Sequence, residues 1–120
     1  VNALADRLET RKGPFIVIGD FNCEWLEREK TLRDFAGRTG LTTFRPWDST
    51  IRTFPKSMRR LDWIFVSPCF SFENQVIFAD PVSDHLAVYG ELGLSEREQN
   101  DACRPRQKVI RQRPLSEMRP

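Results

Sequence analysis

The feature that most constrains the fold is an apolar run at residues 15–18 (FIVI), which ends at residues 19–22 (GDFN). A short run rich in β-branched residues and bounded by glycines is typical of a strand that is buried on both faces. Asp20 and Asn22 follow this run, where a strand would hold them in place while a loop exposes them. The pattern indicates either a functional site at the end of a strand or an ordinary turn, because Gly, Asp and Asn are also common turn residues.

The remaining sequence predicts a mixed order of helices and strands. Apolar residues at the spacing i, i+3, i+4 and i+7 indicate a first helix over residues 1–8. A second helix is predicted over residues 24–39, where acidic residues come early, arginines come late and Gly40 provides a stop. Strands are predicted over residues 41–44, 61–66, 75–78 and 86–92.

Residues 95–120 differ in composition from the rest of the chain. They hold seven basic and four acidic side chains, whereas residues 1–94 hold 12 basic and 13 acidic ones. Few apolar residues are present to offset the entropy of ordering, so we predict a folded region over residues 1–94 and a basic, disordered tail over residues 95–120. Such a tail either binds nucleic acid or another anionic surface, or is only a solvated extension.

Two further polar insertions interrupt predicted strands. Asp62 lies inside an apolar segment, and residues 83–85 (SDH) directly precede another. A carboxylate within a strand is costly unless it is paired, and the chain's single histidine, His85, is the candidate partner. Asp62 would then fix the tautomer of the ring and favour its charged form, while Asp20 and Asp84 would face the same pocket. The alternative is a buried hydrogen bond that only specifies packing.

One cysteine and three tryptophans are further candidates for functional roles. Cys23 follows the GDFN segment and would act as a nucleophile only beside a base, so the alternative is a free, mostly buried thiol. Trp63 lies inside a predicted strand and is expected in the core. Trp25 and Trp47 lie near predicted loops, where they could line a substrate groove and stack on a base or a sugar.

Three segments carry a family resemblance: residues 19–22 (GDFN), 60–65 (RLDWIF) and 83–88 (SDHLAV). In order and spacing they resemble the last three signature blocks of the endonuclease/exonuclease/phosphatase superfamily, and the likeness extends to about residue 94. That superfamily includes apurinic endonucleases, deoxyribonuclease I, inositol polyphosphate phosphatases and neutral sphingomyelinases. The resemblance implies an α+β fold of the DNase I-like type. In that fold, helices pack outside a two-sheet α/β sandwich of mixed, mostly antiparallel strands, and this chain would form its C-terminal half.

The resemblance also implies a mechanism, namely divalent-metal-dependent hydrolysis of phosphodiester or other phosphoester bonds. Asp20 would orient and activate the attacking water. Asn22 would donate a hydrogen bond to a phosphate oxygen or support Asp20. His85, held by Asp62, would stabilise charge on the phosphoryl oxygens in the transition state.

A metal site and a substrate contact follow from the same resemblance. Asp84 and Asp20 would bind the ion, with Asp84 also able to orient His85, and clustered carboxylate oxygens suit Mg²⁺ or Mn²⁺. Thr53 resembles a family position near the phosphate and is predicted to bind substrate. Nothing in residues 1–14 matches the early Asn and Glu blocks of the family, so we expect a truncated domain that is weakly active or inactive alone.

The substrate stays open among nucleic acid, an inositol phosphate and a phospholipid head group. Residues 1–94 lack the strong basic stripe of a dedicated DNA-binding protein. The alternative function is an inactive fragment that acts as a nucleic-acid or protein binding module. We expect a cytoplasmic location, no membrane association and no defined protein partner.

Overall fold

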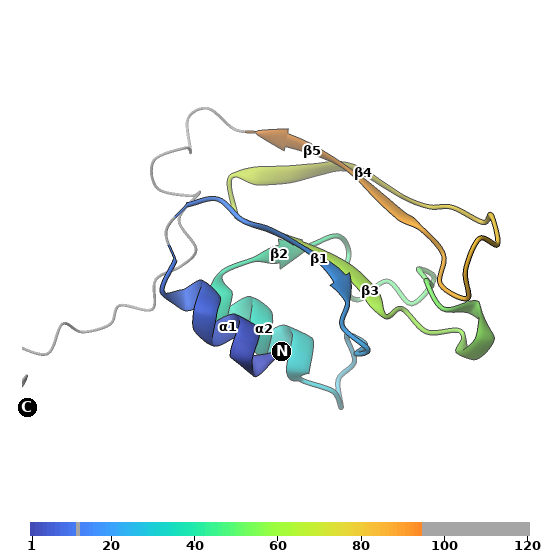
Figure 1. Ribbon diagram of the computed structural model, residues 1–120, viewed down its shortest axis with the longest axis horizontal. Helices are drawn as coiled ribbons and strands as arrows, with labels where there is room; N and C mark the ends of the chain where they lie inside the picture. Colours follow the sequence, from blue (N-terminus) through green and yellow to red (C-terminus); the bar gives the residue numbers. More distant parts are fainter. Residues whose placement is uncertain (12, 95–120) are drawn as a thin grey trace, which may run out of the picture.

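The computed structural model describes residues 1–11 and 13–94, so the predicted tail at residues 95–120 lies outside the described part. Helices and strands alternate along the chain before a run of strands, which confirms the predicted α+β class (Figure 1). None of the described helices is both long enough and apolar enough to cross a membrane. The elements are α1 Asn2–Glu9, β1 Ile16–Asp20, α2 Thr31–Thr39, β2 Thr42–Thr43, the short 3-10 helix η1 Pro55–Ser57, β3 Asp62–Val66, β4 Phe70–Ile77 and β5 Val88–Leu94.

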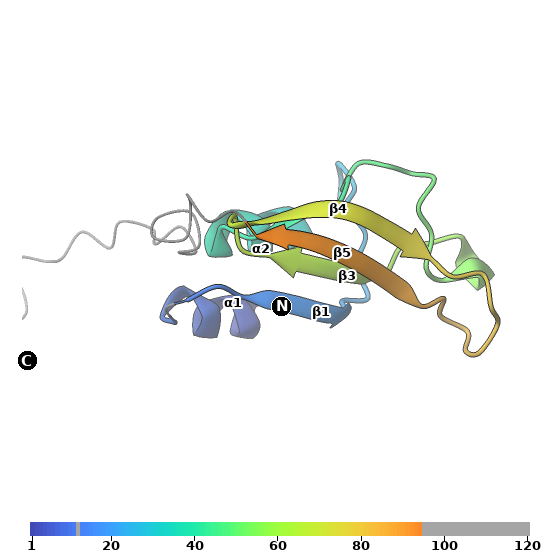
Figure 2. The same cartoon turned by 90° about the horizontal axis from the view of Figure 1, so that it is seen from above.

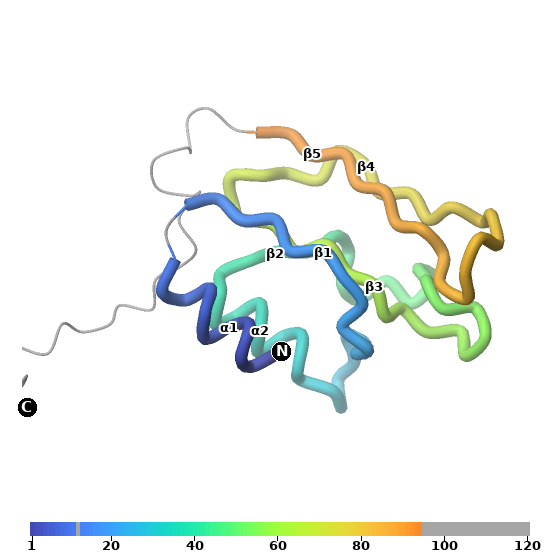
Figure 3. Tube along the Cα trace, in the orientation of Figure 1, coloured from blue at the N-terminus to red at the C-terminus, as the bar shows by residue number. Residues whose placement is uncertain are grey.

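Strand β3 is the centre of a three-stranded antiparallel sheet with the order β1-β3-β2. Its register with β1 places Ile18 opposite Ile64 and Asp20 opposite Asp62. Strands β4 and β5 form a separate antiparallel hairpin, and the chain path that connects the two sheets can be followed in Figure 3. The antiparallel strands and the outer helices agree with part of a DNase I-like sandwich.

The two long helices cover one face of the three-stranded sheet, and the β4–β5 hairpin lies on its other side (Figures 1 and 2). Arg38 of α2 pairs with Asp6 and Glu9 of α1, which ties the helices together. On the opposite face Gly90 of β5 packs against Ile64, where an added Cβ would lie 3.2 Å from the Ile64 Cδ1 atom. Strand β3 is therefore covered on both faces, by the helices on one side and by the β4–β5 hairpin on the other.

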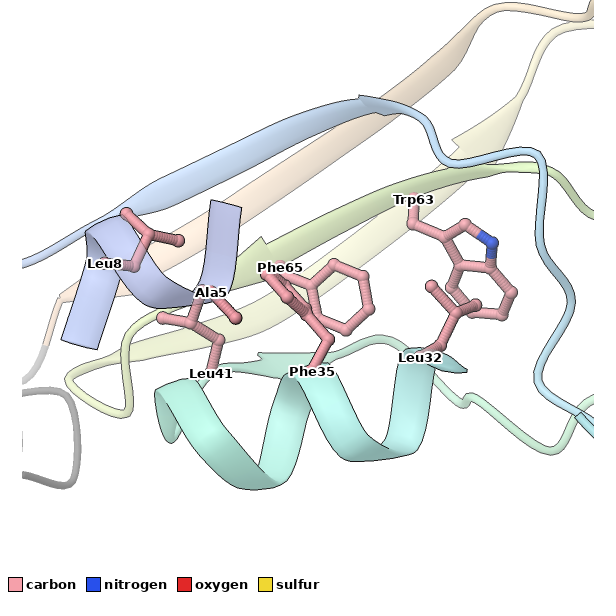
Figure 4. Close-up of a cluster of buried hydrophobic side chains, with 7 residues drawn as sticks. All are labelled: Ala5, Leu8, Leu32, Phe35, Leu41, Trp63 and Phe65. Carbon is pink, nitrogen blue, oxygen red and sulfur yellow. The ribbon is translucent and has the colours of Figure 1, made fainter. Parts of the chain in front are cut away.

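The hydrophobic core lies between the helices and the sheet (Figure 4). Phe65 of β3 is completely buried and its ring packs 5.1 Å from that of Phe35 on α2. Trp63 is 2% exposed, which confirms its predicted place in the core. The buried members of the cluster are Ala5, Leu8, Leu32, Phe35, Leu41, Trp63 and Phe65.

The prediction that the first strand is buried on both faces is wrong. Ile16 and Ile18 of β1 are 47% and 70% exposed, while Val17 between them packs against the core. Among the described strands β1 pairs with β3 alone, so it forms an edge of the sheet, and the hairpin covers β3 instead. Asp20 is also the last residue of the strand and does not follow it.

The second helix is shorter than predicted, because it begins at Thr31 and not at residue 24. The preceding segment forms turns whose carbonyl groups are bonded by a side chain: the Arg33 Nη2 donates to the carbonyls of Leu26 and Glu27 at 2.9 and 2.7 Å. The carbonyl groups of Leu26 and Glu27 are therefore hydrogen-bonded without forming part of a helix. The predicted stop is confirmed, since Gly40 caps α2 with a φ of 73°.

Candidate active site

Two neighbouring strands bring the carboxylates of Asp20 and Asp62 together. Asp20 ends β1, Asp62 begins β3, and the two are directly opposite in the antiparallel register. Opposite residues of an antiparallel pair point to the same face of the sheet with their Cβ atoms about 5 Å apart. Like charges at this spacing repel each other, so a cation or a proton between them stabilises the pair.

His85 supplies such a cation from the loop between β4 and β5. Its Nδ1 lies 2.8 Å from the Asp62 Oδ2, and its Nε2 lies 3.7 Å from the Asp20 Oδ2. The predicted pairing of Asp62 with His85 is therefore present. With Nδ1 donating to Asp62, Nε2 is the ring atom that faces Asp20 and solvent. The Phe54 ring packs 4.9 Å from the imidazole and limits its tilt.

These contacts raise the pKa of His85 above its ordinary value. The hydrogen bond to Asp62 is the largest cause, and the negative charges of Asp62, Asp20 and Asp84 add to it. Partial removal from water acts in the opposite direction but is outweighed. The imidazolium form, which can stabilise an anion, therefore persists to a higher pH than it would for a free histidine.

The turn after β1 orients the Asp20 carboxylate. The backbone amide of Asn22 donates to the Asp20 Oδ1 at 2.8 Å, which leaves Oδ2 toward His85. Asn22 has a φ of 49°, in the left-handed region that asparagine tolerates better than most residues. The Asn22 side chain is exposed, so its amide group is accessible to a ligand beside Asp20. The predicted turn is therefore present, and it holds Asp20 and Asn22, whose predicted roles in catalysis stay predictions.

Thr53 is fully buried and links the elements that carry Asp62 and His85. Its Oγ1 accepts hydrogen bonds from the backbone amides of Leu61 and Asp62, at 2.9 and 3.1 Å. Its carbonyl accepts from the amide of Leu86 at 2.7 Å. Thr53 therefore fixes the separation between the start of β3, which carries Asp62, and the segment that carries His85. Its predicted contact with substrate stays a prediction. This positioning role was missed because nothing in the sequence marks which backbone amides a threonine will bond.

Asp84 lies beside the cluster and not within it. Its carboxylate accepts a hydrogen bond from Ser83 at 3.1 Å, and the Ser83 Oγ in turn accepts from the amide of His85 at 3.2 Å. Both side chains are exposed. The charge of Asp84 is near enough to contribute to the raised pKa of His85.

The cluster of Asp20, Asp62 and His85 offers only some of the free ligand atoms that a metal ion needs. Asp20, Asp62 and His85 each offer a ligand atom within 4.8 Å of the others, and Asp84 is not among the residues grouped there in the described part of the chain. The Asp62 Oδ2 and the His85 Nδ1 already bond each other, so Asp20, with a side chain that is 47% exposed, is the most accessible donor. Carboxylate oxygens suit Mg²⁺ and Mn²⁺, and the ring nitrogen suits transition metals better.

The carboxylates border a small cavity of about 220 Å³. Asp20 and Asp62 line it together with apolar residues from β1, from β3 and from the segment that leads into β5, such as Ile64 and Leu86. A cavity of this size is below the range of about 300 to 1,000 Å³ that is usual for drug-sized ligands.

Cys23 has the wrong electrostatic surroundings for a nucleophile. Burial, followed by the negative charge of Glu29, raises the pKa of its thiol. A reactive cysteine needs the opposite shift, because the thiolate is the attacking species. The structure thus favours the alternative of a free, partly buried thiol.

Comparison with known proteins agrees with this geometry. Residues 1–85 match the Endonuclease/Exonuclease/phosphatase family. No curated protein and no solved structure gave a match. The family match spans more than two thirds of the chain and includes Asp20, Asp62 and His85. The chain therefore belongs to the Endonuclease/Exonuclease/phosphatase family, whose members are generally hydrolases of phosphoester bonds.

Proposed function

We propose that this chain carries the site of a divalent-metal-dependent phosphodiester hydrolase. The observation that supports this most directly is the position of His85 between two carboxylates, with Nδ1 on Asp62 at 2.8 Å and Nε2 directed toward Asp20 at 3.7 Å. An imidazolium so held presents one N–H to a phosphoryl oxygen, while Asp20 is exposed enough to contact a water.

Each residue then has a distinct task. Asp20, oriented by the amide of Asn22, accepts a proton from the water whose oxygen attacks phosphorus. His85 donates a hydrogen bond from Nε2 to a phosphoryl oxygen as negative charge develops there, and Asp62 keeps the ring charged and aligned. The bond to the leaving oxygen breaks as the new bond forms. A divalent ion, if held by the exposed carboxylate of Asp20, would neutralise charge on the phosphate.

We further propose that residues 1–94 are the C-terminal part of a larger domain. The support is the exposed face of β1, where Ile16 and Ile18 are in contact with solvent along a sheet edge. Exposed apolar residues on an edge strand are typical of a surface on which another segment packs.

The test of the proposed activity is hydrolysis of bis(p-nitrophenyl) phosphate by the purified chain, with Mg²⁺ or Mn²⁺ and with a chelator. We expect metal-dependent turnover that falls by about 10²- to 10⁴-fold in Asp20→Asn and His85→Ala, the range for loss of one acid–base or anion-stabilising group. Asp34→Asn is the matched control, because Asp34 is an exposed carboxylate in the first turn of α2.

Turnover that persists in the chelator would contradict the proposed metal dependence. Turnover that is unchanged in His85→Ala would contradict the proposed site. If the chain is silent with every metal, the same assay is repeated with an upstream segment of the domain supplied. Silence in that assay would count against the function itself.

A further inference from the structure

One nitrogen of the His85 ring is not held in place by a hydrogen bond. The Nδ1 is fixed by the Asp62 Oδ2 at 2.8 Å, whereas the Nε2 lies 3.7 Å from the Asp20 Oδ2. A separation of 3.7 Å is beyond hydrogen-bonding distance, so the Nε2 has no hydrogen-bond partner among the described residues. Another contact must therefore fix the direction in which this nitrogen points.

A single hydrogen bond leaves an imidazole ring able to turn. The torsion between the Cβ atom and the ring has broad energy minima, and the ring can also tilt about the line that joins Nδ1 to its acceptor. Both movements keep the His85 Nδ1 near Asp62 but displace the Nε2 on the far side of the ring. A catalytic group needs to stay within about 0.5 Å of its productive position, so a second contact with the ring is required.

The side chain of Phe54 makes this second contact. The centroid of its ring lies 4.9 Å from that of the His85 ring, with an angle of 48° between the two planes. Aromatic rings attract each other at separations of about 4.5 to 7 Å, and a tilted arrangement is among the favourable ones. A ring packed against the imidazole prevents it from turning toward that side. Phe54 thus restricts the two movements that the bond to Asp62 leaves open.

The backbone of Phe54 is itself fixed. Its amide donates to the carbonyl of Arg59 at 2.9 Å, and the amide of Arg59 donates back to the carbonyl of Phe54 at 3.1 Å. Pro55 follows and keeps the preceding residue out of the helical region, in agreement with the φ of −124° at Phe54. Met58 completes the turn with a φ of 58°. The Phe54 ring is therefore carried by a backbone that is already ordered.

The turn that carries this ring is also bonded to the segments that carry the candidate site. At its start, the Thr53 hydroxyl accepts from the amide of Asp62 at 3.1 Å, and the Thr53 carbonyl accepts from the amide of Leu86 at 2.7 Å. At its end, the Arg59 Nε pairs with the Glu24 Oε1 at 3.0 Å, in the segment that follows β1. The position of the turn relative to the histidine is therefore set by the fold.

Phe54 does not have the surroundings of a core residue. It is only partly buried and is not among the side chains that form or pack against the hydrophobic core cluster. The core phenylalanines Phe35 and Phe65 contact each other, whereas the ring of Phe54 contacts the imidazole of His85. The location of this ring agrees with a role at the histidine and not with a role in the core.

We propose that Phe54 is a positioning residue of the candidate active site, which holds the His85 ring so that Nε2 faces the space beside Asp20. Phe54 acts through the histidine and contacts neither the attacking water nor the phosphate. Its effect on turnover rests on the proposed phosphodiester hydrolase function. Its effect on the order of the ring is measured without substrate.

The experiment is a measurement of the mobility of the His85 ring by ¹³C relaxation of its Cε1–H bond, in the full chain at one fixed pH and in metal-free buffer. His85 is the only histidine of the chain, so the signal needs no further assignment. Phe54→Leu keeps an apolar side chain but removes the ring. In this variant we expect the order parameter to fall from about 0.85, the level of a rigid backbone, to below about 0.6.

Two further observations separate positioning from a general loss of structure. The signal of the His85 Nδ1 proton should persist in Phe54→Leu, because the bond to Asp62 is not removed. Phe54→Tyr keeps the aromatic ring and should restore the order parameter. Unchanged ring order in Phe54→Leu would overturn the proposal, and so would equal mobility in the Leu and Tyr variants.

Phe44→Leu is the matched control. Phe44 is also partly buried and packs against one aromatic ring, that of Phe72 at 5.7 Å, and it does not line the cavity at Asp20 and Asp62. Its replacement should leave the order of the His85 ring unchanged. An equal loss of ring order in Phe44→Leu and Phe54→Leu would show general loosening and would overturn the assignment to Phe54.

Hydrolysis of bis(p-nitrophenyl) phosphate gives the kinetic measurement. Phe54→Leu should lower kcat by roughly 10- to 100-fold with KM nearly unchanged, because a misplacement of about 1 Å costs a factor of up to about 100. Phe54→Tyr should keep most of kcat. A raised KM with an unchanged kcat would overturn the proposal, because it would indicate that Phe54 contacts the substrate directly.

The two measurements distinguish failure of this inference from failure of the proposed function. A chain that hydrolyses the phosphodiester but keeps its ring order and its kcat in Phe54→Leu would retain the function and lose the positioning role. A chain whose ring becomes mobile in Phe54→Leu, but which is silent even with an upstream segment supplied, would retain the hold of Phe54 on His85 and lose the function.

Discussion

Strands β1 and β3 are paired along their whole length, yet they differ sharply in burial. Residues Trp63 to Val66 of β3 are all buried, whereas Ile16 and Ile18 of β1 are largely exposed. The difference follows from position: β3 has a strand on each side, helices on one face and the hairpin on the other. An apolar run alone therefore does not tell a central strand from an edge strand.

The same difference separates the two carboxylates of the candidate site. The side chain of Asp62 on β3 is 20% exposed and bonds His85, while that of Asp20 on β1 is 47% exposed and stands 3.7 Å from the ring. A mostly buried carboxylate that is already hydrogen-bonded is suited to holding a histidine. An exposed carboxylate is suited to contact with water, metal or substrate. The central strand thus provides the fixed part of the site and the edge strand the accessible part.

The largest effect should come from removing a core side chain of β3. Phe65→Ala should destabilise the chain by about 3–5 kcal/mol, because a fully buried phenyl ring in contact with Phe21 and Phe35 would leave a cavity. Ile18→Ala on β1 is the matched control and should cost less than about 1 kcal/mol, since its side chain is 70% exposed. Denaturant unfolding measures the stability of both variants. Equal losses of stability would contradict the difference in burial between β1 and β3.

The sequence was most informative where polar residues interrupt apolar strands. Asp62 inside a strand required a partner, and the single histidine of the chain was the obvious candidate, so their contact could be predicted from the cost of burying an unpaired charge. The first helix and the Gly40 stop were likewise readable, because both depend on local patterns. The family resemblance added the order of the three segments.

Features that depend on distant packing could not be read in this way. The exposure of Ile18 depends on which strand the hairpin covers, and the loss of helix over residues 24–30 depends on a side chain from the following helix. The hollow of about 340 Å³ that Trp25, Trp47 and Trp63 line is formed by segments that are far apart in the chain, so the sequence does not show that they meet. Tryptophans near predicted loops indicated such a groove, but the burial of Arg60, which is only 4% exposed, became visible only in three dimensions.

A smaller effect should follow from loosening the start of β3. Thr53→Val removes the hydroxyl that accepts from the amides of Leu61 and Asp62 but keeps the shape of the side chain. Leaving buried amides unpaired should cost about 1–3 kcal/mol, and activity should fall because Asp62 and His85 are no longer held in register. Thr53→Ser keeps the hydroxyl and should restore most of the stability. If Val and Ser behave alike, the hydroxyl does not anchor the strand.

The smallest effect, and the most direct test of the two carboxylates, is the titration of His85. As the only histidine of the chain it gives a single ring signal by NMR, which can be followed against pH in metal-free buffer. The pKa should be highest in the unmodified chain, lower in Asp20→Asn and lowest in Asp62→Asn. The reason is that the hydrogen bond to Asp62 raises the pKa most, while Asp20 acts through its charge alone. Asp34→Asn should leave the titration unchanged.

The sign of the accompanying stability change follows from the direction of this shift. Because folding raises the pKa of His85, the stabilisation is fully present below the pKa of the unfolded chain, about 6.5, and is lost as the pH rises through the higher folded value. Asp62→Asn should therefore lower the stability of the chain most below a pH of about 6.5, and progressively less as the pH rises through the folded pKa. Asp20→Asn should lower the stability less over the same range. Equal pKa values in the two variants would mean that the edge strand holds the histidine as firmly as the central one, and the division between a fixed and an accessible carboxylate would fail.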